Sequence, residues 1–297
     1  MNADADRAPC ECDGLRLAQL PAFLTDTAAF CLAFISRNLG YILRRLALPA
    51  VAGFLVLYLF LSGYCSKVLV FLSHPSGGIA SQILGIAAVG AMVMLLLHAV
   101  VVAIIADLGM NGLDAPWCVR RVAAFAWRIY VAMLRLCILT LLMAIVIGVC
   151  NAFLDVLPPY VNDTVHVGFL LGIFWLFCRG WFFIAPVCLL SSERSTLRKV
   201  WQQSAAHLLP IATIPLLIFA AAATLQLGVE FLLLAVGAIT LPGSFSDFAH
   251  VMRFYQENLL LLTLLFSLTY LMVTVILTTA SIYAYQRLVS GTTSVAA

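Results

Sequence analysis

The chain has few charged residues, and this scarcity excludes the ordinary soluble fold classes. Only 10% of its 297 residues are charged and 64% are hydrophobic, whereas soluble domains carry roughly 25% charged residues. A soluble domain of this length could not bury so much apolar side chain, so lipid must be the solvent for much of it. The net charge of +3 is also too small for a nucleic-acid-binding surface, and no nucleic-acid partner is expected.

A cleaved signal peptide and a disulfide framework are also missing. The first residues, MNADADRAPCECDG, contain neither the basic nor the apolar region of a signal peptide, so the N-terminus is expected in the cytoplasm. The nine cysteines are scattered and lie mostly in or near apolar segments, which is not a disulfide pattern. Cys10 and Cys12 form the only close pair. Because no second pair or histidine lies nearby, we predict no metal and no other cofactor.

Enzyme signatures are absent from the sequence. The motifs of zinc peptidases, serine hydrolases, P-loop proteins and dinucleotide-binding domains do not occur. Paired carboxylates for acid-base chemistry are missing from the apolar segments as well. We therefore expect a protein that is not an enzyme and has no catalytic residues.

The sequence does contain six long apolar segments. Each is long enough to cross a hydrocarbon core of about 30 Å at about 1.5 Å of helical rise per residue. They lie at about 46–64, 80–106, 131–153, 167–190, 208–236 and 259–284. With polar tails at 1–21 and 291–297, they predict an all-α fold: an integral membrane six-helix bundle within residues 22–290, with basic helices at its cytoplasmic interface.

The distribution of basic residues predicts the orientation of this bundle. Lys67 and Arg253 fall on one side of the predicted spans, and Arg179 falls inside the fourth. All other Lys and Arg residues fall on the opposite side: Arg7, Arg16, Arg37, Arg44, Arg45, Arg120, Arg121, Arg128, Arg135, Arg194, Arg198, Lys199 and Arg287. Because Lys and Arg accumulate in cytoplasmic loops, both termini are expected in the cytoplasm.

Three basic helices are predicted at this cytoplasmic side, each before a pair of spans. The first has a basic face made of Arg37, Arg44 and Arg45, which either meets lipid headgroups or simply holds the cytoplasmic end of the first span. In the second, Arg121, Arg128 and Arg135 recur every seven residues, a spacing that drifts only about 20° per step and so forms one stripe.

The third basic helix is predicted to be amphipathic. It begins near Ser195, and its spacing forms an apolar face that consists of Leu197, Val200, Trp201, Ser204 and Leu208. Largely opposite lie Arg198, Lys199, Gln202 and Gln203. We expect it to lie in the membrane plane.

Two residues inside the spans are candidates for function. Arg179 lies about twelve residues into the fourth span, where a charge costs about 2.5 to 3.5 kcal/mol on insertion scales. It either holds an anionic ligand or is a structural anchor that pairs with helix carbonyls. His98 in the second span either lines a cavity or is a packing residue. Asp107 near the end of that span is a candidate partner for an arginine of one of the basic helices.

The sixth span has hydroxyl-bearing side chains along one face: Thr263, Ser267, Tyr270, Thr274, Thr278, Ser281 and Tyr285. One interpretation is that this face lines a cavity, with His98, Ser267, Thr274 and Thr278 as lining residues. The other is that it packs against a neighbouring helix, which is a common use of Ser and Thr in membranes. Small residues similarly predict close packing of the second span: Gly85, Ala88 and Ala91, with Ser81.

Three stretches carry a family resemblance. Arg179 is followed by Pro186, a polar turn at 191–193 and a basic helix with a tryptophan; the other two stretches are Arg37 to Pro49 and the closing ASIYAYQRL. This pattern resembles the membrane domain attached to some bacterial glycerophosphodiester phosphodiesterases and its stand-alone relatives, the YciC-like inner-membrane proteins. The resemblance implies a six-helix, multi-pass protein of the bacterial inner membrane. It does not imply phosphodiesterase activity, because the catalytic domain is not in this sequence.

The leading hypothesis is a non-enzymatic membrane protein that acts at the cytoplasmic face. It would bind or organise anionic phospholipid headgroups of the bilayer, or contact a membrane-protein partner or a second copy of itself. The candidate anion-binding residues are Arg179, Arg121, Arg128, Arg135, Arg198 and Lys199. The alternative is a transporter or channel for a small anionic or amphiphilic solute, with Arg179, His98 and the hydroxyl face around its path. A purely structural assembly factor is compatible with the same sequence.

Overall fold

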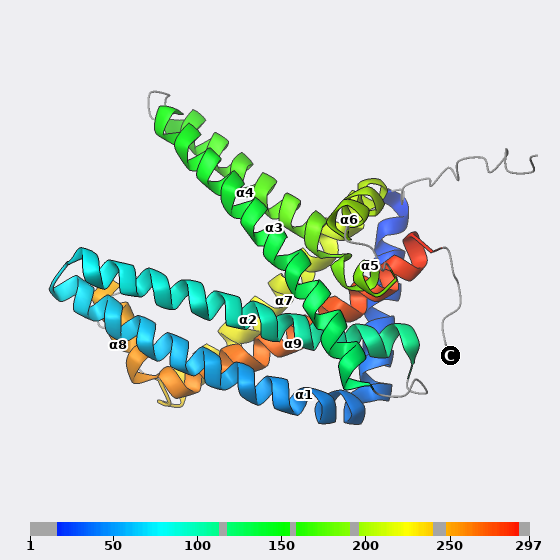
Figure 1. Cartoon of the computed structure of the whole chain (residues 1–297), viewed down its shortest axis with the longest axis horizontal. Helices are drawn as coiled ribbons and strands as arrows, with labels where there is room; N and C mark the ends of the chain where they lie inside the picture. The colour runs from blue at the N-terminus through cyan, green and yellow to red at the C-terminus, as the bar shows by residue number, and fades with distance from the viewer. Residues whose placement is uncertain (1–16, 113–117, 155–158, 191–195, 240–247, 291–297) are drawn as a thin grey trace, which may run out of the picture.

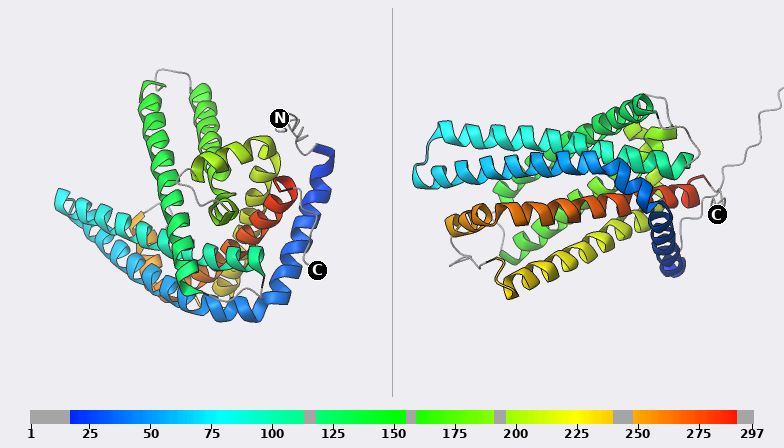
Figure 2. Two further views of the ribbon diagram at one scale, coloured as in Figure 1. Left: turned by 45° about the vertical axis from the view of Figure 1, so that its right-hand side comes forward. Right: turned by 90° about the horizontal axis from the view of Figure 1, so that it is seen from below.

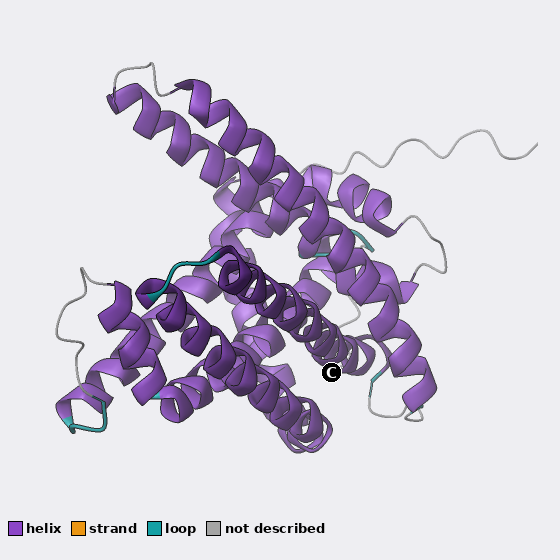
Figure 3. Cartoon of the chain, turned by 60° about the vertical axis from the view of Figure 1, so that its left-hand side comes forward, coloured by secondary structure: helices purple, strands orange, loops and turns teal. Residues whose placement is uncertain are grey.

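The computed structural model describes residues 17–112, 118–154, 159–190, 196–239 and 248–290. Cys10, Cys12 and the polar turn at 191–193 lie outside these residues. Every regular element in the described ranges is a helix (Figure 3), which confirms the all-α prediction for them. Six helical segments are long and apolar enough to cross a membrane, as in a multi-pass membrane protein.

The first two long helices form a hairpin. After a short 3-10 turn at Leu17–Gln19, α1 runs over Leu20–Ser73 and α2 over Gly77–Asn111. The first basic helix and the first span are therefore one continuous helix of 54 residues. Its first part turns away from the direction of the rest (Figure 2), and it contains Pro49, whose missing N–H and bulky ring weaken a helix locally.

The next hairpin consists of α3 (Val119–Leu154) and α4 (Pro159–Trp181). The fourth predicted span, 167–190, is not one helix. It breaks after Trp181, and α5 (Ile184–Leu190) follows a turn at Phe182 and Phe183. Pro186 accounts for this break, because its missing N–H leaves the carbonyl of Phe182, four residues earlier, without a helical partner.

The remaining helices are α6 (Thr196–Ser204), a 3-10 turn at Ala205–His207, α7 (Leu208–Ala235), α8 (Phe248–Glu257) and α9 (Leu259–Leu288). The apolar face predicted for α6 is confirmed at Val200 and Ser204, which are fully buried, while Arg198 opposite them is exposed. Leu197 and Trp201 are half-buried, and Leu208, which begins α7, is 37% exposed. α6 contacts α4 and α5. Its buried face therefore has protein helices as partners.

Buried side chains concentrate at one end of the molecule, which we call the compact end. It consists of Phe23–Leu46 of α1, His98–Leu108 of α2, Arg121–Leu136 of α3, Cys178–Cys188 of α4 and α5, Arg198–Ile214 of α6 and α7, and Val273–Tyr285 of α9. The start of α1 packs beside the end of α9, with the rings of Phe30 and Tyr283 4.8 Å apart. Beyond the compact end, the hairpins α1–α2 and α3–α4 diverge (Figure 1) and expose mainly apolar side chains.

Close packing of α1 against α2 occurs at a different small residue from those expected. A Cβ added at Gly85 would meet nothing within 4 Å, whereas one added at Gly90 would collide with the ring of Phe60. Ala91 is exposed. The expectation that Gly85 and Ala91 mark the close contact of the second span was therefore wrong, and Gly90 makes it.

Candidate functional site

A cavity of about 270 Å³ lies where the hairpins separate from the compact end. Five helices contribute to it: α2 between Ala91 and His98, α3 between Met133 and Cys137, and parts of α4, α7 and α9. None of the residues that line it is Asp, Glu, Lys or Arg. The cavity therefore favours an apolar ligand over a charged one.

His98 is the most polar side chain in this cavity, and α9 holds it in place. His98 is 8% exposed. Its Nδ1 lies 2.5 Å from the hydroxyl of Tyr270 and 3.5 Å from that of Thr274. The ring also stacks on the indole of Trp181, with centroids 5.9 Å apart. No described residue forms a hydrogen bond with Nε2, so this atom is available to a ligand.

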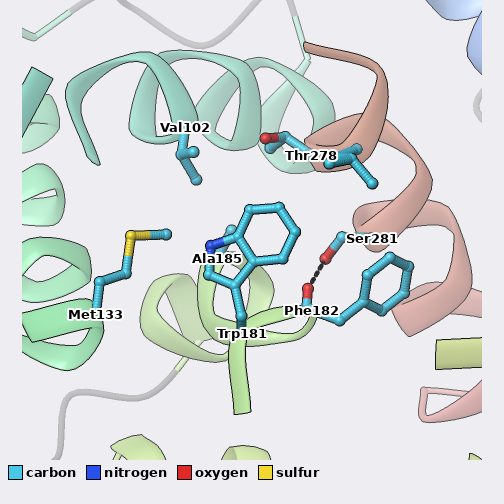
Figure 4. A pocket seen from close by; sticks show the side chains of 8 residues that line it. Val102, Met133, Trp181, Phe182, Ala185, Thr278 and Ser281 are labelled. Atoms are coloured by element: carbon cyan, nitrogen blue, oxygen red, sulfur yellow. Dashed lines mark hydrogen bonds between the residues drawn. The ribbon is translucent and has the colours of Figure 1, made fainter. Parts of the chain in front are cut away.

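Trp181 separates this cavity from a second, much smaller one. The indole lines both and points into the space between Val102, Met133 and Thr278 (Figure 4). The smaller space has a volume of about 10 Å³, which is enough for at most one water molecule. It is therefore no ligand site at its present size.

The break between α4 and α5 lies at the edge of this smaller space. Ser281 of α9 donates a hydrogen bond to the carbonyl oxygen of Phe182 (Figure 4), the group that Pro186 leaves without a helical donor. In a lipid-embedded protein an unsatisfied backbone group costs several kcal/mol. At this position the hydroxyl face of α9 therefore stabilises a broken helix.

The guanidinium group of Arg179 forms hydrogen bonds and ring contacts within the protein. Its Nε donates to Oγ of Ser204 at 3.2 Å, and its Nη2 donates to the carbonyl oxygen of Trp201 at 3.1 Å. The guanidinium also lies over the rings of Trp175 and Trp201, 5.4 and 4.6 Å from their centroids. Its contacts are at the C-terminal end of α6, where a helix dipole favours a cation. This geometry fits the second interpretation of Arg179, a structural anchor that pairs with helix carbonyls.

Arg121 is also engaged. Its Nη2 lies 3.0 Å from Oδ2 of Asp107, and the amide of Asn111 donates to the other carboxylate oxygen at 2.8 Å. The pairing that the sequence suggested for Asp107 is thus confirmed, and it links the end of α2 to the start of α3. The carboxylate is 8% exposed and the arginine 40%, so a buried acid is paired with a base that reaches the protein surface.

The other predicted basic residues differ in exposure. Arg128, Arg135 and Arg198 are exposed, and Lys199 is half-buried. Trp127 beside them on α3 is 60% exposed and packs on the ring of Tyr130. The exposed apolar part of α3 begins directly after Arg135, at Ile138 and Leu139.

The residues predicted to line a cavity differ in which cavity they line in the structure. His98 and Thr274 line the larger cavity and Thr278 lines the smaller one, while Ser267 lines neither. Sequence reasoning missed the contribution of Trp181 and of Phe219 from α7. Pro186 was the signal for the helix break, and no local signal indicated Phe219.

Comparison with known proteins gives no further assignment. No family model matches the chain, and no curated protein or solved structure is similar enough to count as a match. Among the residues described here, no group of three or more His, Cys, Asp or Glu is arranged to hold a metal ion.

Proposed function

We propose that this chain is a non-enzymatic protein of the bacterial inner membrane that binds anionic phospholipid headgroups, with both termini in the cytoplasm. The observation that carries the proposal is the exposure of three arginines that we call the basic surface: Arg128 and Arg135 on α3 and Arg198 on α6. An exposed tryptophan beside Arg128 fits the headgroup depth, where Trp is enriched. The resemblance to YciC-like proteins points to the same membrane.

Helix length supports the same placement. α2 and α3 have 35 and 36 residues, or about 50 Å of helix, whereas the hydrocarbon core is about 30 Å thick. The exposed apolar parts of these helices fill that thickness. The compact end, with its exposed arginines, then reaches the anionic headgroups.

The roles of the six candidate residues differ in this proposal. Arg128, Arg135 and Arg198 contact phosphates, and Lys199 adds charge beside them. Arg179 and Arg121 act by holding α6 and the α2–α3 connection, because their guanidinium groups have partners within the protein.

Removal of charge at the exposed surface tests the proposal. Each basic residue near an anionic membrane surface contributes about 1 kcal/mol. The double variant Arg128→Gln with Arg135→Gln should therefore lower the affinity for phosphatidylglycerol about tenfold or more. The measurement is native mass spectrometry of the protein titrated with phosphatidylglycerol and, separately, with phosphatidylcholine.

The matched control removes the same charge from the opposite end of the molecule. Lys67→Gln with Arg253→Gln should leave the preference for phosphatidylglycerol unchanged. If the two double variants behave alike in folded protein, the basic surface does not bind headgroups and the proposal is wrong.

A second candidate function is transport of an amphiphilic solute, as a transporter or channel. Its specific support is the broken α4–α5 segment beside a cavity, since broken helices mark the binding sites of many transporters. Its path would include His98, Thr274 and Thr278. An anionic solute is disfavoured, because no Lys or Arg lines the larger cavity.

Water access separates transport from headgroup binding. If a path exists, Thr274→Cys and Thr278→Cys should react with a water-soluble maleimide in reconstituted vesicles. The control, Thr224→Cys, is on the exposed surface of α7 and should stay unreactive within the bilayer. Protection of all three positions would count against a path.

A further inference from the structure

We propose that the cavity beside His98 binds an uncharged membrane lipid, with an oxygen of its head group hydrogen-bonded to Nε2 of His98. The head group is a hydroxyl or carbonyl on an apolar chain. This ligand differs from the anionic headgroups proposed for the basic surface, so each proposal can fail without the other.

The chemistry of the cavity defines the ligand class. Its lining is apolar apart from His98, Tyr270, Thr274 and the weakly polar Cys137 and Trp181. Tyr270 and Thr274 both face Nδ1 of the histidine, which leaves Nε2 on the other edge of the ring. An imidazole in an apolar cavity binds a neutral hydroxyl or carbonyl oxygen well, because that head group carries no charge to desolvate. A phosphate group in this cavity would have no cation to pair with, because no Lys or Arg lines it.

The mouth of the cavity indicates that the ligand enters from the membrane. Ala91 of α2 is exposed and Phe219 of α7 is 45% exposed, and both line the cavity. Their neighbours Met92 and Leu216 are also exposed and apolar. A ligand that passes between them therefore crosses an apolar surface, as a lipid chain does and a water-soluble solute does not.

The size of the cavity limits what it holds. About 270 Å³ is slightly below the roughly 300 to 1,000 Å³ of typical small-molecule pockets. The cavity therefore accommodates a head group and the start of a chain. The rest of the chain remains between α2 and α7 in contact with bilayer lipid.

Photolabelling of the full-length protein in nanodiscs tests the assignment. The probe is 1-hexadecanol with a diazirine on its chain next to the head group. Mass spectrometry should find its cross-links on residues that line the cavity. His98→Phe should lower this labelling about three- to tenfold, as expected for one lost hydrogen bond. Hexadecane with the same diazirine should label the cavity weakly in both proteins.

Two further variants keep the test decisive if His98→Phe does not fold. Ala91→Phe narrows the mouth without touching the histidine and should also reduce labelling. Leu84→Phe adds the same ring to an exposed site of α2 that does not line the cavity and should leave labelling unchanged.

Three labelling results would contradict the proposed lipid site. Equal labelling by the alcohol and the hydrocarbon, or cross-links spread evenly over the exposed apolar surface, would overturn the proposal. So would equal labelling of the Ala91→Phe and Leu84→Phe variants.

Discussion

The carbonyl of Phe182 illustrates how single residues hold this protein together. Pro186 removes the N–H that would bond this carbonyl in a continuous helix, and the hydroxyl of Ser281, 99 residues away in sequence, donates to it instead. Two other hydroxyls on the same face, those of Thr263 and Ser267, are buried without a hydrogen-bond partner in the described residues. The hydroxyl groups on this face of α9 therefore differ in whether they have a hydrogen-bond partner.

This difference predicts opposite effects for two serine substitutions. Ser281→Ala leaves the carbonyl of Phe182 buried and unsatisfied, which should lower the free energy of unfolding by about 1 to 3 kcal/mol. Ser267→Ala removes a hydroxyl that has no partner, so it should be neutral or slightly stabilising. Denaturant titration of both variants in one detergent measures the two changes. Equal destabilisation would mean that the bond to Phe182 contributes nothing.

At the scale of the elements, α6 is a short helix whose position depends on Arg179. Nine residues are too few for a stable isolated helix, so α6 must be held by its contacts. Val200 and Ser204 supply the buried face. Arg179 bonds the last turn and stacks on Trp201. The fourth span and the amphipathic helix after it thus form one unit.

Loss of Arg179 should loosen this unit. Arg179→Leu removes two charge-assisted hydrogen bonds and two cation–π contacts, and should lower the free energy of unfolding by about 2 to 4 kcal/mol. Arg198→Leu on the exposed side of α6 is the control and should change stability little. Limited proteolysis between α6 and α7, together with denaturant titration, measures the effect. An Arg179→Leu variant as stable as wild type, with less bound phosphatidylglycerol, would instead make Arg179 a ligand residue.

At the scale of the whole molecule, the end where buried side chains concentrate also contains several of the charged residues. The compact end contains the Asp107–Arg121 pair, Arg179 and the exposed arginines of α3 and α6, whereas Arg253 lies on α8 at the far end of α9. The parts of the long helices between these ends expose mainly apolar side chains. This arrangement suits a membrane whose cytoplasmic leaflet meets the compact end.

Labelling from one side of the membrane tests this orientation. In intact cells, a membrane-impermeant maleimide should react with Arg253→Cys and not with Arg198→Cys, and permeabilisation should make both reactive. The parent chain for both should contain Cys118→Ser, because Cys118 is exposed. Reaction of Arg198→Cys in intact cells would reverse the proposed orientation.

The sequence by itself determined the class of the protein and much of its local structure. Hydropathy and helical periodicity are local properties, so they predicted the helical fold, the apolar segments, the buried face of α6 and the partner type of Asp107. The span boundaries were less predictable: the first basic helix continues into the first span, and the fourth span breaks at Phe182 and Phe183.

Only the tertiary structure decided which distant residues meet. His98 and Tyr270 are 172 residues apart, and Arg179 binds residues 22 and 25 positions later. In an apolar sequence many helix pairings bury similar surface, so hydropathy does not distinguish among them. Close approach at residues such as Gly90, and the need to satisfy each buried polar group, select one arrangement. The cavity beside His98 exists because that arrangement leaves the two hairpins apart where five helices meet.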